Sequence, residues 1–154
     1  MNPAYMVAAA IAARREVPVP KQEAAVQYLC LIYSDENQWL KLSRSEHDRV
    51  LGEYLAYTEQ VRQSGHLRGG GPLEPTTAAT TVRVRNGSVS TTDGPFAETK
   101  ELLGGILVLE ARDKEEAVAL IMRHPGIRMG GFEVRPADEE FMKQHPVLRQ
   151  LQEQ

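Results

Sequence analysis

Residues 93–101 gather the side chains whose types and spacing could do chemistry. The segment reads Asp-Gly-Pro-Phe-Ala-Glu-Thr-Lys-Glu and stands directly before an apolar run that starts at Leu102. Asp93 is expected on tightly folded backbone, because Gly94 supplies torsional freedom and Pro95 supplies rigidity. Burial can tune a carboxylate at the rim of a pocket, which makes Asp93 a candidate general base. An Asx-turn, in which its side chain caps local amides, is an equal alternative.

The charged side chains after this turn could hold a polar ligand. Lys100 could neutralise an anionic substrate, and Glu98 and Glu101 could bind its polar groups. The same charges could instead pair with one another, and exposed ion pairs contribute little to stability. Phe96 is expected to form a wall of the core or of a pocket. The candidate ligand-binding residues are therefore Gly94, Pro95, Phe96, Glu98, Lys100 and Glu101.

Four histidines are present, and His66 is the one that could act as an acid or base. It follows a predicted helix and precedes a run of glycines, so it could face a cleft. A solvated histidine at a helix end is the alternative. The spacing of the histidines is not that of metal ligands, so we expect neither a metal nor a cofactor. The remaining three are expected at the surface, in helix starts or tails: His47, His124 and His145.

The composition is that of a soluble globular protein with one domain. The chain has 154 residues, of which 42% are hydrophobic and 25% are charged. A net charge of −3 argues against direct nucleic-acid binding, which needs a basic stripe. No apolar run approaches the roughly 20 residues of a membrane span. Because Arg14 and Arg15 follow the apolar segment 7–13, the charge order opposes a secretory signal, and we expect a cytoplasmic protein without membrane contact.

Three regions are expected along the chain. Residues 1–25 form an N-terminal extension, disordered or packed on a partner, because a short helix over 8–15 would end before the Val-Pro-Val-Pro stretch at 17–20. Residues 26–137 form the domain. Residues 138–154 form a polar C-terminal tail, with a final helix interrupted at proline.

One helix is marked at both of its ends. Ser43 and Glu46 form a capping box, apolar residues recur behind them at helical spacing, and Gly65 supplies the stop. Residues 69–71, all glycine, are expected to be a flexible passage. A second helix is expected between Asp113 and the His-Pro-Gly stop at 124–126.

The strands complete an α+β pattern. Apolar runs at 27–33 and 103–110 predict buried strands, and 132–134 predicts a last one. Alternation over 80–85, followed by Asn-Gly and a return arm to 92, predicts a hairpin. This order favours a ferredoxin-like βαββαβ plait with an extra hairpin strand. Both helices would cover one sheet face and leave the other bare and apolar, which favours a homodimer.

Five segments of the chain resemble the DGPF-domain branch of the YCII-related proteins, over about residues 27–136. These segments are Tyr28–Tyr33, Thr81–Arg85, Asp93–Glu101, Leu103–Gly105 and Phe132–Pro136. The resemblance implies a dimeric α/β barrel of two ferredoxin-like subunits, in a bacterial, cytoplasmic family of mostly unassigned function. Genes of this branch often accompany sigma factors of the extracytoplasmic-function class, which implies a regulatory partnership.

Some relatives in the wider superfamily resemble isomerases or dehydrochlorinases that use a His–Asp pair. Their pattern places the histidine in the first helix, where this chain has Tyr54, whereas His47 comes too early. The dyad therefore does not carry over.

Two functions follow from the sequence. The first is a small dimeric protein with a ligand pocket between sheet and helices, lined in part by the Asp93 turn, that does cofactor-free acid–base chemistry of the isomerase or lyase type. The second is a non-enzymatic module that binds a small molecule or a regulatory partner such as a sigma factor.

Overall fold

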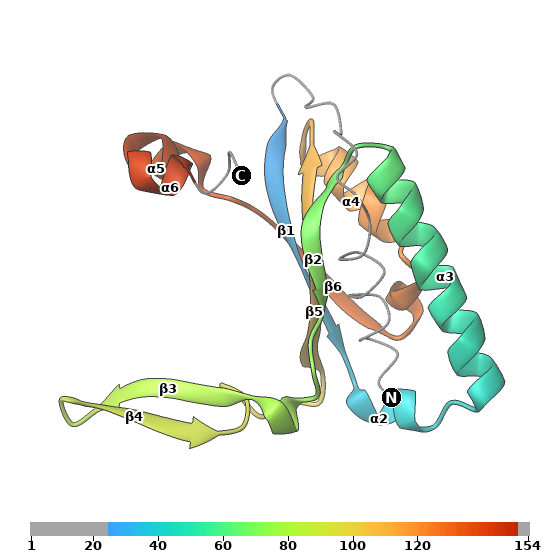
Figure 1. The fold of residues 1–154 in the computed structure, drawn as a ribbon, viewed down its shortest axis with the longest axis horizontal. Coiled ribbons are helices and arrows are strands. Elements are labelled where there is room, and N and C mark those ends of the chain that lie inside the picture. Colours follow the sequence, from blue (N-terminus) through green and yellow to red (C-terminus); the bar gives the residue numbers. More distant parts are fainter. Residues whose placement is uncertain (1–24, 151–154) are drawn as a thin grey trace.

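The computed structural model describes residues 25–150. The expected N-terminal extension therefore lies outside the described residues, except for its last position. A four-stranded sheet forms the middle of the molecule, helices cover one of its faces, and a two-stranded hairpin projects from the other side (Figure 1).

The central sheet is antiparallel throughout, with the strand order β2-β5-β1-β6. Its strands are β1 (Val26–Ser34), β2 (Leu67–Pro72), β5 (Leu102–Ala111) and β6 (Gly130–Pro136). This order is the one expected of a ferredoxin-like plait, and the predicted α+β class is confirmed. Within residues 25–150, β2 and β6 are open edges, so this single chain does not close a barrel.

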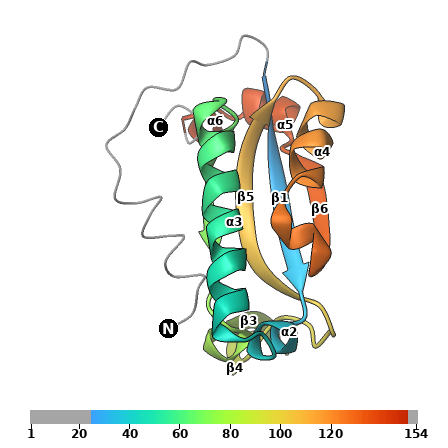
Figure 2. The ribbon, with the colours of Figure 1, turned by 90° about the vertical axis from the view of Figure 1, so that its right-hand side faces the viewer.

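Two longer helices, α3 (Arg44–Gln63) and α4 (Lys114–Met122), cover the same face of this sheet (Figure 2). The predicted capping box begins α3, since Ser43 accepts from the Glu46 backbone and Glu46 accepts from the Ser43 backbone. Gly65 has a φ of 85° just past the helix end, which confirms the predicted stop. The short helices are α2 (Glu36–Leu40), η1 (Thr76–Ala78), η2 (Pro125–Arg128), α5 (Glu139–Gln144) and α6 (Pro146–Arg149).

The core lies between the sheet and these two helices. Alternate residues of the central strands point into it, and Cys30 and Leu109 are fully buried there. Burial raises the pKa of the Cys30 thiol to about 12, so this cysteine is a small buried hydrophobe, as predicted, and not a nucleophile.

The glycine run at 69–71 is an edge strand, not the predicted flexible passage. It belongs to β2 and pairs with β5, with Gly70 opposite Leu107. Gly70 has a φ of 112°, and a Cβ at this position would stand 2.1 Å from the Ile106 carbonyl oxygen. Only glycine allows the two strands to approach this closely.

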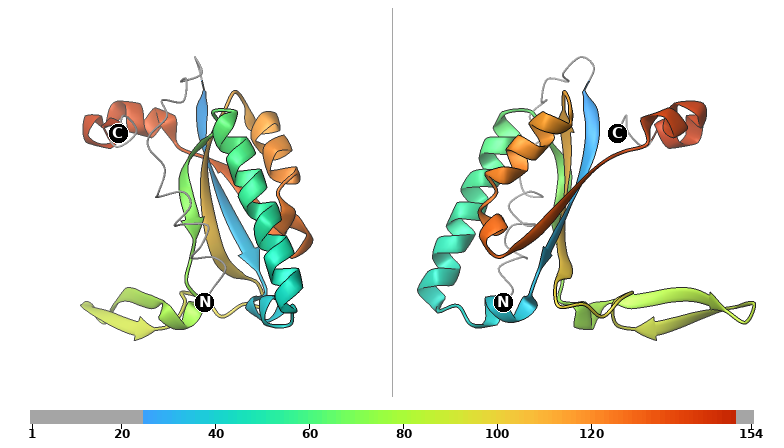
Figure 3. Two further views of the ribbon diagram at one scale, coloured as in Figure 1. Left: turned by 45° about the vertical axis from the view of Figure 1, so that its right-hand side comes forward. Right: turned by 180° about the vertical axis from the view of Figure 1, so that it is seen from behind.

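The predicted hairpin forms, but it does not join the central sheet. Strands β3 (Thr80–Arg85) and β4 (Ser88–Asp93) make a separate two-stranded sheet. Asn86 and Gly87 have φ values of 51° and 76°, as the Asn-Gly turn requires. The hairpin therefore does not supply the extra strand of the plait, because it projects away from the sheet (Figure 3).

The second face of the central sheet is bare in the described part of the chain. Leu29 lies at its centre, between the buried Tyr28 and Cys30, and remains 40% exposed. The hairpin projects at one end of this open face, and α5 and α6 project at the other end (Figures 1 and 3).

Candidate functional site

A partly enclosed cavity of about 490 Å³ lies between the sheet and α3. Its walls come from β1, α2, α3, the segment from β2 to η1, β5 and the turn after α4. Four of its side chains carry rings that could hold a ligand, and we call it the aromatic cavity. These four are Trp39, His47, Tyr54 and His124.

The rings of the aromatic cavity touch in series. The Trp39 ring lies 6.0 Å from His47 and meets Tyr54 edge-on at 5.8 Å between centroids. The Tyr54 ring in turn lies 5.1 Å from His124. These residues come from α2, α3 and the turn after α4, so only the folded chain brings them together.

His124 is the buried polar centre of this series. Its exposed fraction is only 6%, and the rings of Tyr57 and Phe132 lie 4.6 and 4.9 Å away. The Gly126 N–H donates to Nδ1 at 2.9 Å, so the neutral ring carries its proton on Nε2. Burial lowers the pKa of His124 to about 4 and keeps the ring neutral at pH 7. The predicted surface position of His124 was wrong.

The Nε2–H of His124 has no hydrogen-bond partner within residues 25–150. This donor is not fully shut off from solvent-accessible space, so a ligand or water can accept from it. His124 lines the aromatic cavity and also the second hollow described below, so that acceptor can enter from either side.

Tyr54 supplies a second donor on α3. Burial raises the pKa of its phenol to about 12, so the phenol remains protonated at pH 7. Its hydroxyl would lie 2.8 Å from a Cβ at Gly126, so the absence of a side chain there leaves room for the tyrosine. His47 also lines the cavity, which corrects its predicted position at the surface.

Two carboxylates, Glu36 and Glu74, also line the cavity. Glu36 accepts from the Thr76 backbone N–H at 2.9 Å and from the Thr76 hydroxyl at 3.2 Å, which joins α2 to η1. Within residues 25–150, no lysine or arginine is among the lining residues.

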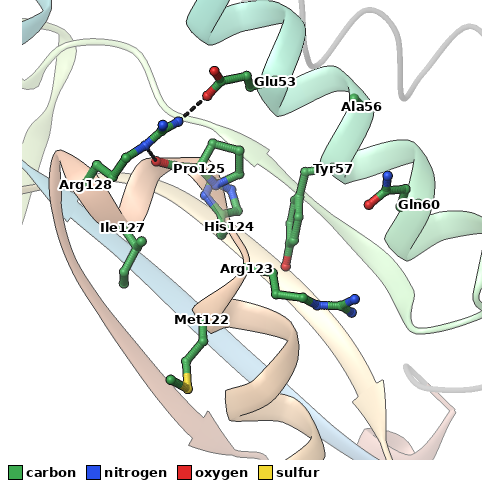
Figure 4. A pocket seen from close by; sticks show the side chains of 10 residues that line it. All are labelled: Glu53, Ala56, Tyr57, Gln60, Met122, Arg123, His124, Pro125, Ile127 and Arg128. Carbon is green, nitrogen blue, oxygen red and sulfur yellow. Dashed lines mark hydrogen bonds and ion pairs between the residues drawn. The ribbon is translucent and has the colours of Figure 1, made fainter.

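A second hollow, on the other flank of α3, is a shallow open groove of about 440 Å³ (Figure 4). Arg128 crosses it, donating to Glu53 and, at 3.2 Å, to the Pro125 carbonyl oxygen. The Arg128–Glu53 pair satisfies both charges. The groove is open, and two of its charged side chains, Arg128 and Glu53, are paired with each other, so it is a weaker candidate site than the aromatic cavity.

The Asp93 turn does not line the aromatic cavity. Asp93 is exposed at the end of β4, opposite Thr80. Gly94, with a φ of 107°, donates its N–H to the Ala79 carbonyl and accepts from the Thr81 hydroxyl, both at 2.8 Å. The expected pocket between sheet and helices is present, but this turn is not part of its wall. A catalytic role for Asp93 stays a prediction.

The rest of the segment is also outside the cavity. Arg83 donates to the Phe96 carbonyl at 2.8 Å and lies 4.2 Å above the centre of its ring. Phe96 is 74% exposed and so forms no wall of the core in this chain. Glu98, Lys100 and Glu101 are exposed, and none forms an ion pair in the described part of the chain. These positions do not test whether the segment binds a ligand. Ligand binding by Gly94, Pro95 and the other residues of the segment therefore stays a prediction.

His66 joins the end of α3 to the start of α4. Its Nδ1 lies 2.8 Å from the Ser64 hydroxyl, and its Nε2 lies 3.5 Å from a carboxylate oxygen of Glu116. His66 does not line the aromatic cavity. These contacts give it a structural role, and its predicted acid–base role stays a prediction.

No helix among residues 25–150 combines the length and the apolar character that a membrane crossing requires. In the same residues, no three histidine, cysteine, aspartate or glutamate side chains gather closely enough to hold a metal ion.

Comparison with known proteins assigns the fold to a family. The model of the YCII-related domain matches residues 26–140. The chain belongs to the YCII-related family. A relative of this YCII-related protein, an uncharacterized protein from Rhizobium meliloti (strain 1021), is 36% identical over 111 residues. That alignment covers 71% of the present chain and 90% of the relative.

Two side chains on the cavity wall of this YCII-related protein are hydrogen-bond donors. His124 and Tyr54 both present N–H or O–H groups at pH 7. No carboxylate is hydrogen-bonded to His124 or His47 in the described residues. The cavity therefore lacks a His–carboxylate pair and contains instead a neutral imidazole among aromatic rings.

Proposed function

We propose that this YCII-related protein binds a small organic molecule in the aromatic cavity. The observation that carries the proposal is the Nε2–H of His124, which has no hydrogen-bond partner within residues 25–150, on the wall of a 490 Å³ cavity. Cavities of about 300–1,000 Å³ with apolar walls and a few placed polar groups are the usual form of small-molecule sites. Rings from α2 and α3 would hold a planar ligand, and the His124 Nε2–H would fix its orientation.

Cofactor-free acid–base chemistry of the isomerase or lyase type is the second candidate function. A neutral imidazole and a protonated phenol can polarise a carbonyl oxygen, as electrophilic catalysts do. His124 and Tyr54 fulfil these two roles within one cavity. A proton acceptor would also be required, and His47 is the candidate, because it is the other imidazole of the wall. Binding without catalysis requires no such group.

Filling the cavity should abolish ligand binding. Thr58→Phe adds a ring to the wall of the aromatic cavity, whereas Ala56→Phe adds the same ring to the shallow groove on the other flank of α3. In thermal-shift screening with small aromatic compounds, we expect hits for the wild type and for Ala56→Phe. Thr58→Phe should lose at least about tenfold in affinity for each hit, since the added ring occupies the same space.

The binding proposal would be rejected by either of two results. One is that no small aromatic compound stabilises the wild-type protein. The other is that hits bind Thr58→Phe as tightly as the wild type, provided that circular dichroism shows both variants folded.

We also propose that two copies associate through the open face of the central sheet. Exposed apolar side chains on this side have no cover from residues 25–150 of one chain, and an antiparallel sheet with one bare apolar face commonly pairs with another. Two copies joined in this way would give the dimeric barrel. The exposed apolar residues on the face and its projecting elements include Leu29, Val82, Val84, Val89, Phe96 and Phe141.

A charge at the centre of the open face should separate the copies. In sedimentation analysis the wild type should be a dimer, and Leu29→Glu should weaken dimerisation by at least about a hundredfold, because the new carboxylate would lose its hydration in the interface. Arg135 lies opposite position 29, but its guanidinium already donates to Glu133. Met122→Glu is the matched control, because Met122 is 70% exposed on α4, on the helical side. A monomeric wild type, or equal dissociation constants for all three proteins, would contradict the proposed interface.

We propose that the chain belongs to the DGPF branch, because the motif at residues 93–101 resembles that of the branch. We also propose that this segment acts at the dimer interface, because the hairpin that leads into it projects on the open-face side (Figure 1). The cytoplasmic location and a regulatory link to a sigma factor remain predictions from the sequence, on which no described contact bears.

A further inference from the structure

Two tyrosines on neighbouring turns of α3 differ in how their hydroxyls are used. Tyr57 donates to the Leu120 carbonyl oxygen at 2.8 Å, which satisfies its hydroxyl inside the chain. Tyr54 makes no hydrogen bond through its hydroxyl within residues 25–150. Burial raises the pKa of both phenols to about 12, so both are protonated donors at pH 7. The Tyr54 hydroxyl is therefore a donor that remains available on the wall of the aromatic cavity.

His124 presents a second donor beside this hydroxyl. The ring centroids of Tyr54 and His124 lie 5.1 Å apart. A Cβ at Gly126 would stand 2.8 Å from the Tyr54 hydroxyl and 3.1 Å from Cε1 of His124, the ring carbon bonded to Nε2. The phenol and the imidazole thus approach the same point of the wall, and neither donor has a partner in the described part of the chain.

Both donors are accessible to a ligand. Among the described residues, the side-chain atoms that are fully enclosed and lack a hydrogen-bond partner belong to His66 and Arg68, not to Tyr54 or His124. His124 lines both hollows beside α3, but Tyr54 lines only the aromatic cavity. A ligand that accepts from both donors therefore lies in the aromatic cavity.

A carbonyl oxygen is the acceptor that suits two neutral donors. It has two lone pairs, so it can accept from an N–H and an O–H at the same time. In an aryl ketone or amide the carbonyl lies close to the plane of the ring, so ring packing and hydrogen bonding require the same orientation. An ionised group fits less well, because a buried charge needs a partner and no lysine or arginine within residues 25–150 lines the cavity.

We propose that the aromatic cavity selects uncharged aromatic carbonyl compounds, whose carbonyl oxygen accepts from the Tyr54 hydroxyl and the His124 Nε2–H. This inference rests on the proposed function, because it names the ligand class of the same site. The ring of the ligand lies among the side chains of Trp39, His47 and Tyr54, which contact one another in series.

Pairs of ligands that differ only at the carbonyl group test this recognition. The pairs are acetophenone with α-methylstyrene and 1-indanone with indane, and each hydrocarbon reports packing without an acceptor. Calorimetric titration of the full-length protein at pH 7.5 gives the dissociation constants. Tyr54→Phe removes only the hydroxyl and should weaken each ketone about fivefold or more, whereas the affinity of its hydrocarbon should change by less than about twofold.

Two further variants complete the comparison. Tyr57→Phe is the matched control, because its hydroxyl is bonded to Leu120 and lies outside the cavity wall, so the ratio of ketone to hydrocarbon affinity should not change. His124→Asn retains an acceptor for the Gly126 N–H but has no donor at the position of Nε2. This variant should lower the ratio about fivefold or more.

Three results would contradict the inference. An unchanged ratio in folded Tyr54→Phe or His124→Asn would overturn carbonyl recognition and leave cavity binding intact. Tighter binding of benzoate than of acetophenone would overturn the preference for an uncharged ligand. No binding of any of the five compounds would contradict both this inference and the aromatic-ligand site on which it rests.

Discussion

Gly70→Ala is expected to destabilise the protein by about 3 kcal/mol or more, a loss of about 10 °C in Tm. The new methyl group would stand 2.1 Å from the Ile106 carbonyl oxygen, far inside van der Waals contact. The residue would also have to hold a φ of 112°, which L side chains avoid. The clash is with the backbone of β5, so a rotamer change cannot relieve it.

Gly69→Ala is the matched control in the same strand. A Cβ at Gly69 would meet nothing within 4 Å, so its stability should stay within about 0.5 kcal/mol of the wild type. Urea-induced unfolding followed by circular dichroism measures both variants. Equal stabilities for the two variants would show that β2 does not pair with β5 as described.

Acid is expected to remove about 3 kcal/mol of stability through His124 alone. Burial lowers the pKa of this side chain from 6.5 to about 4 in the folded protein. The folded state therefore binds fewer protons than the unfolded state between these two values. The contribution is fully present above pH 6.5, and it is lost as the pH falls from 6.5 to 4.

His124→Asn isolates this contribution. Its amide oxygen can replace Nδ1 as the acceptor for the Gly126 N–H, but the side chain does not titrate. The variant should be less stable at pH 7, because the ring contacts are lost, yet its stability should fall less between pH 7 and pH 4. Carboxylates with lowered pKa, including Asp113 and Glu116, weaken both proteins in acid and cancel in the difference. Parallel pH profiles would contradict a buried neutral His124.

The elements with local signals were predictable. The Ser43–Glu46 capping box and Gly65 marked both ends of α3 because caps depend on neighbouring residues. The Asn86–Gly87 turn marked the hairpin for the same reason. Such signals define elements, but they do not state whether a hairpin joins the main sheet, and β3 and β4 do not.

Strand β2 could not be recognised from its own sequence. A strand is predicted from side chains that alternate between two faces, and three consecutive glycines have none. Their pairing with β5 is a backbone interaction with residues far along the chain. Position 70 must be glycine because the backbone of β5 lies so close to it. The local sequence around Gly70 does not reveal that β5 is its neighbour.

The aromatic cavity was missed because its residues are distant in sequence and individually unremarkable there. His124 precedes Pro125 and Gly126, a pattern that equally describes an exposed helix stop. Its burial depends on Tyr54 and Tyr57, which α3 supplies from much earlier in the chain. The spacing of those two tyrosines places them on neighbouring turns of one helix, and this was the available signal for an aromatic cluster. The spacing alone does not show that His124 is the residue that both rings contact.

The most conspicuous motif and the cavity occupy different parts of the molecule. The motif from Asp93 onward follows a projecting hairpin, whereas the cavity lies under α3. Local geometry explains much of the motif, since Gly94 turns the chain and Phe96 packs beneath Arg83. Any direct part of the motif in ligand binding would have to arise in the proposed dimer.

Fluorescence of Trp39 is the most direct test of ligand binding in the aromatic cavity. Trp39 is the single tryptophan of the chain, and it lies in the cavity wall. Titration with 1-indanone and indane should change its emission saturably in the wild type and in Ala56→Phe, and leave Thr58→Phe almost unchanged. Emission that is unaffected by both compounds, or that changes equally in Thr58→Phe, would contradict the account.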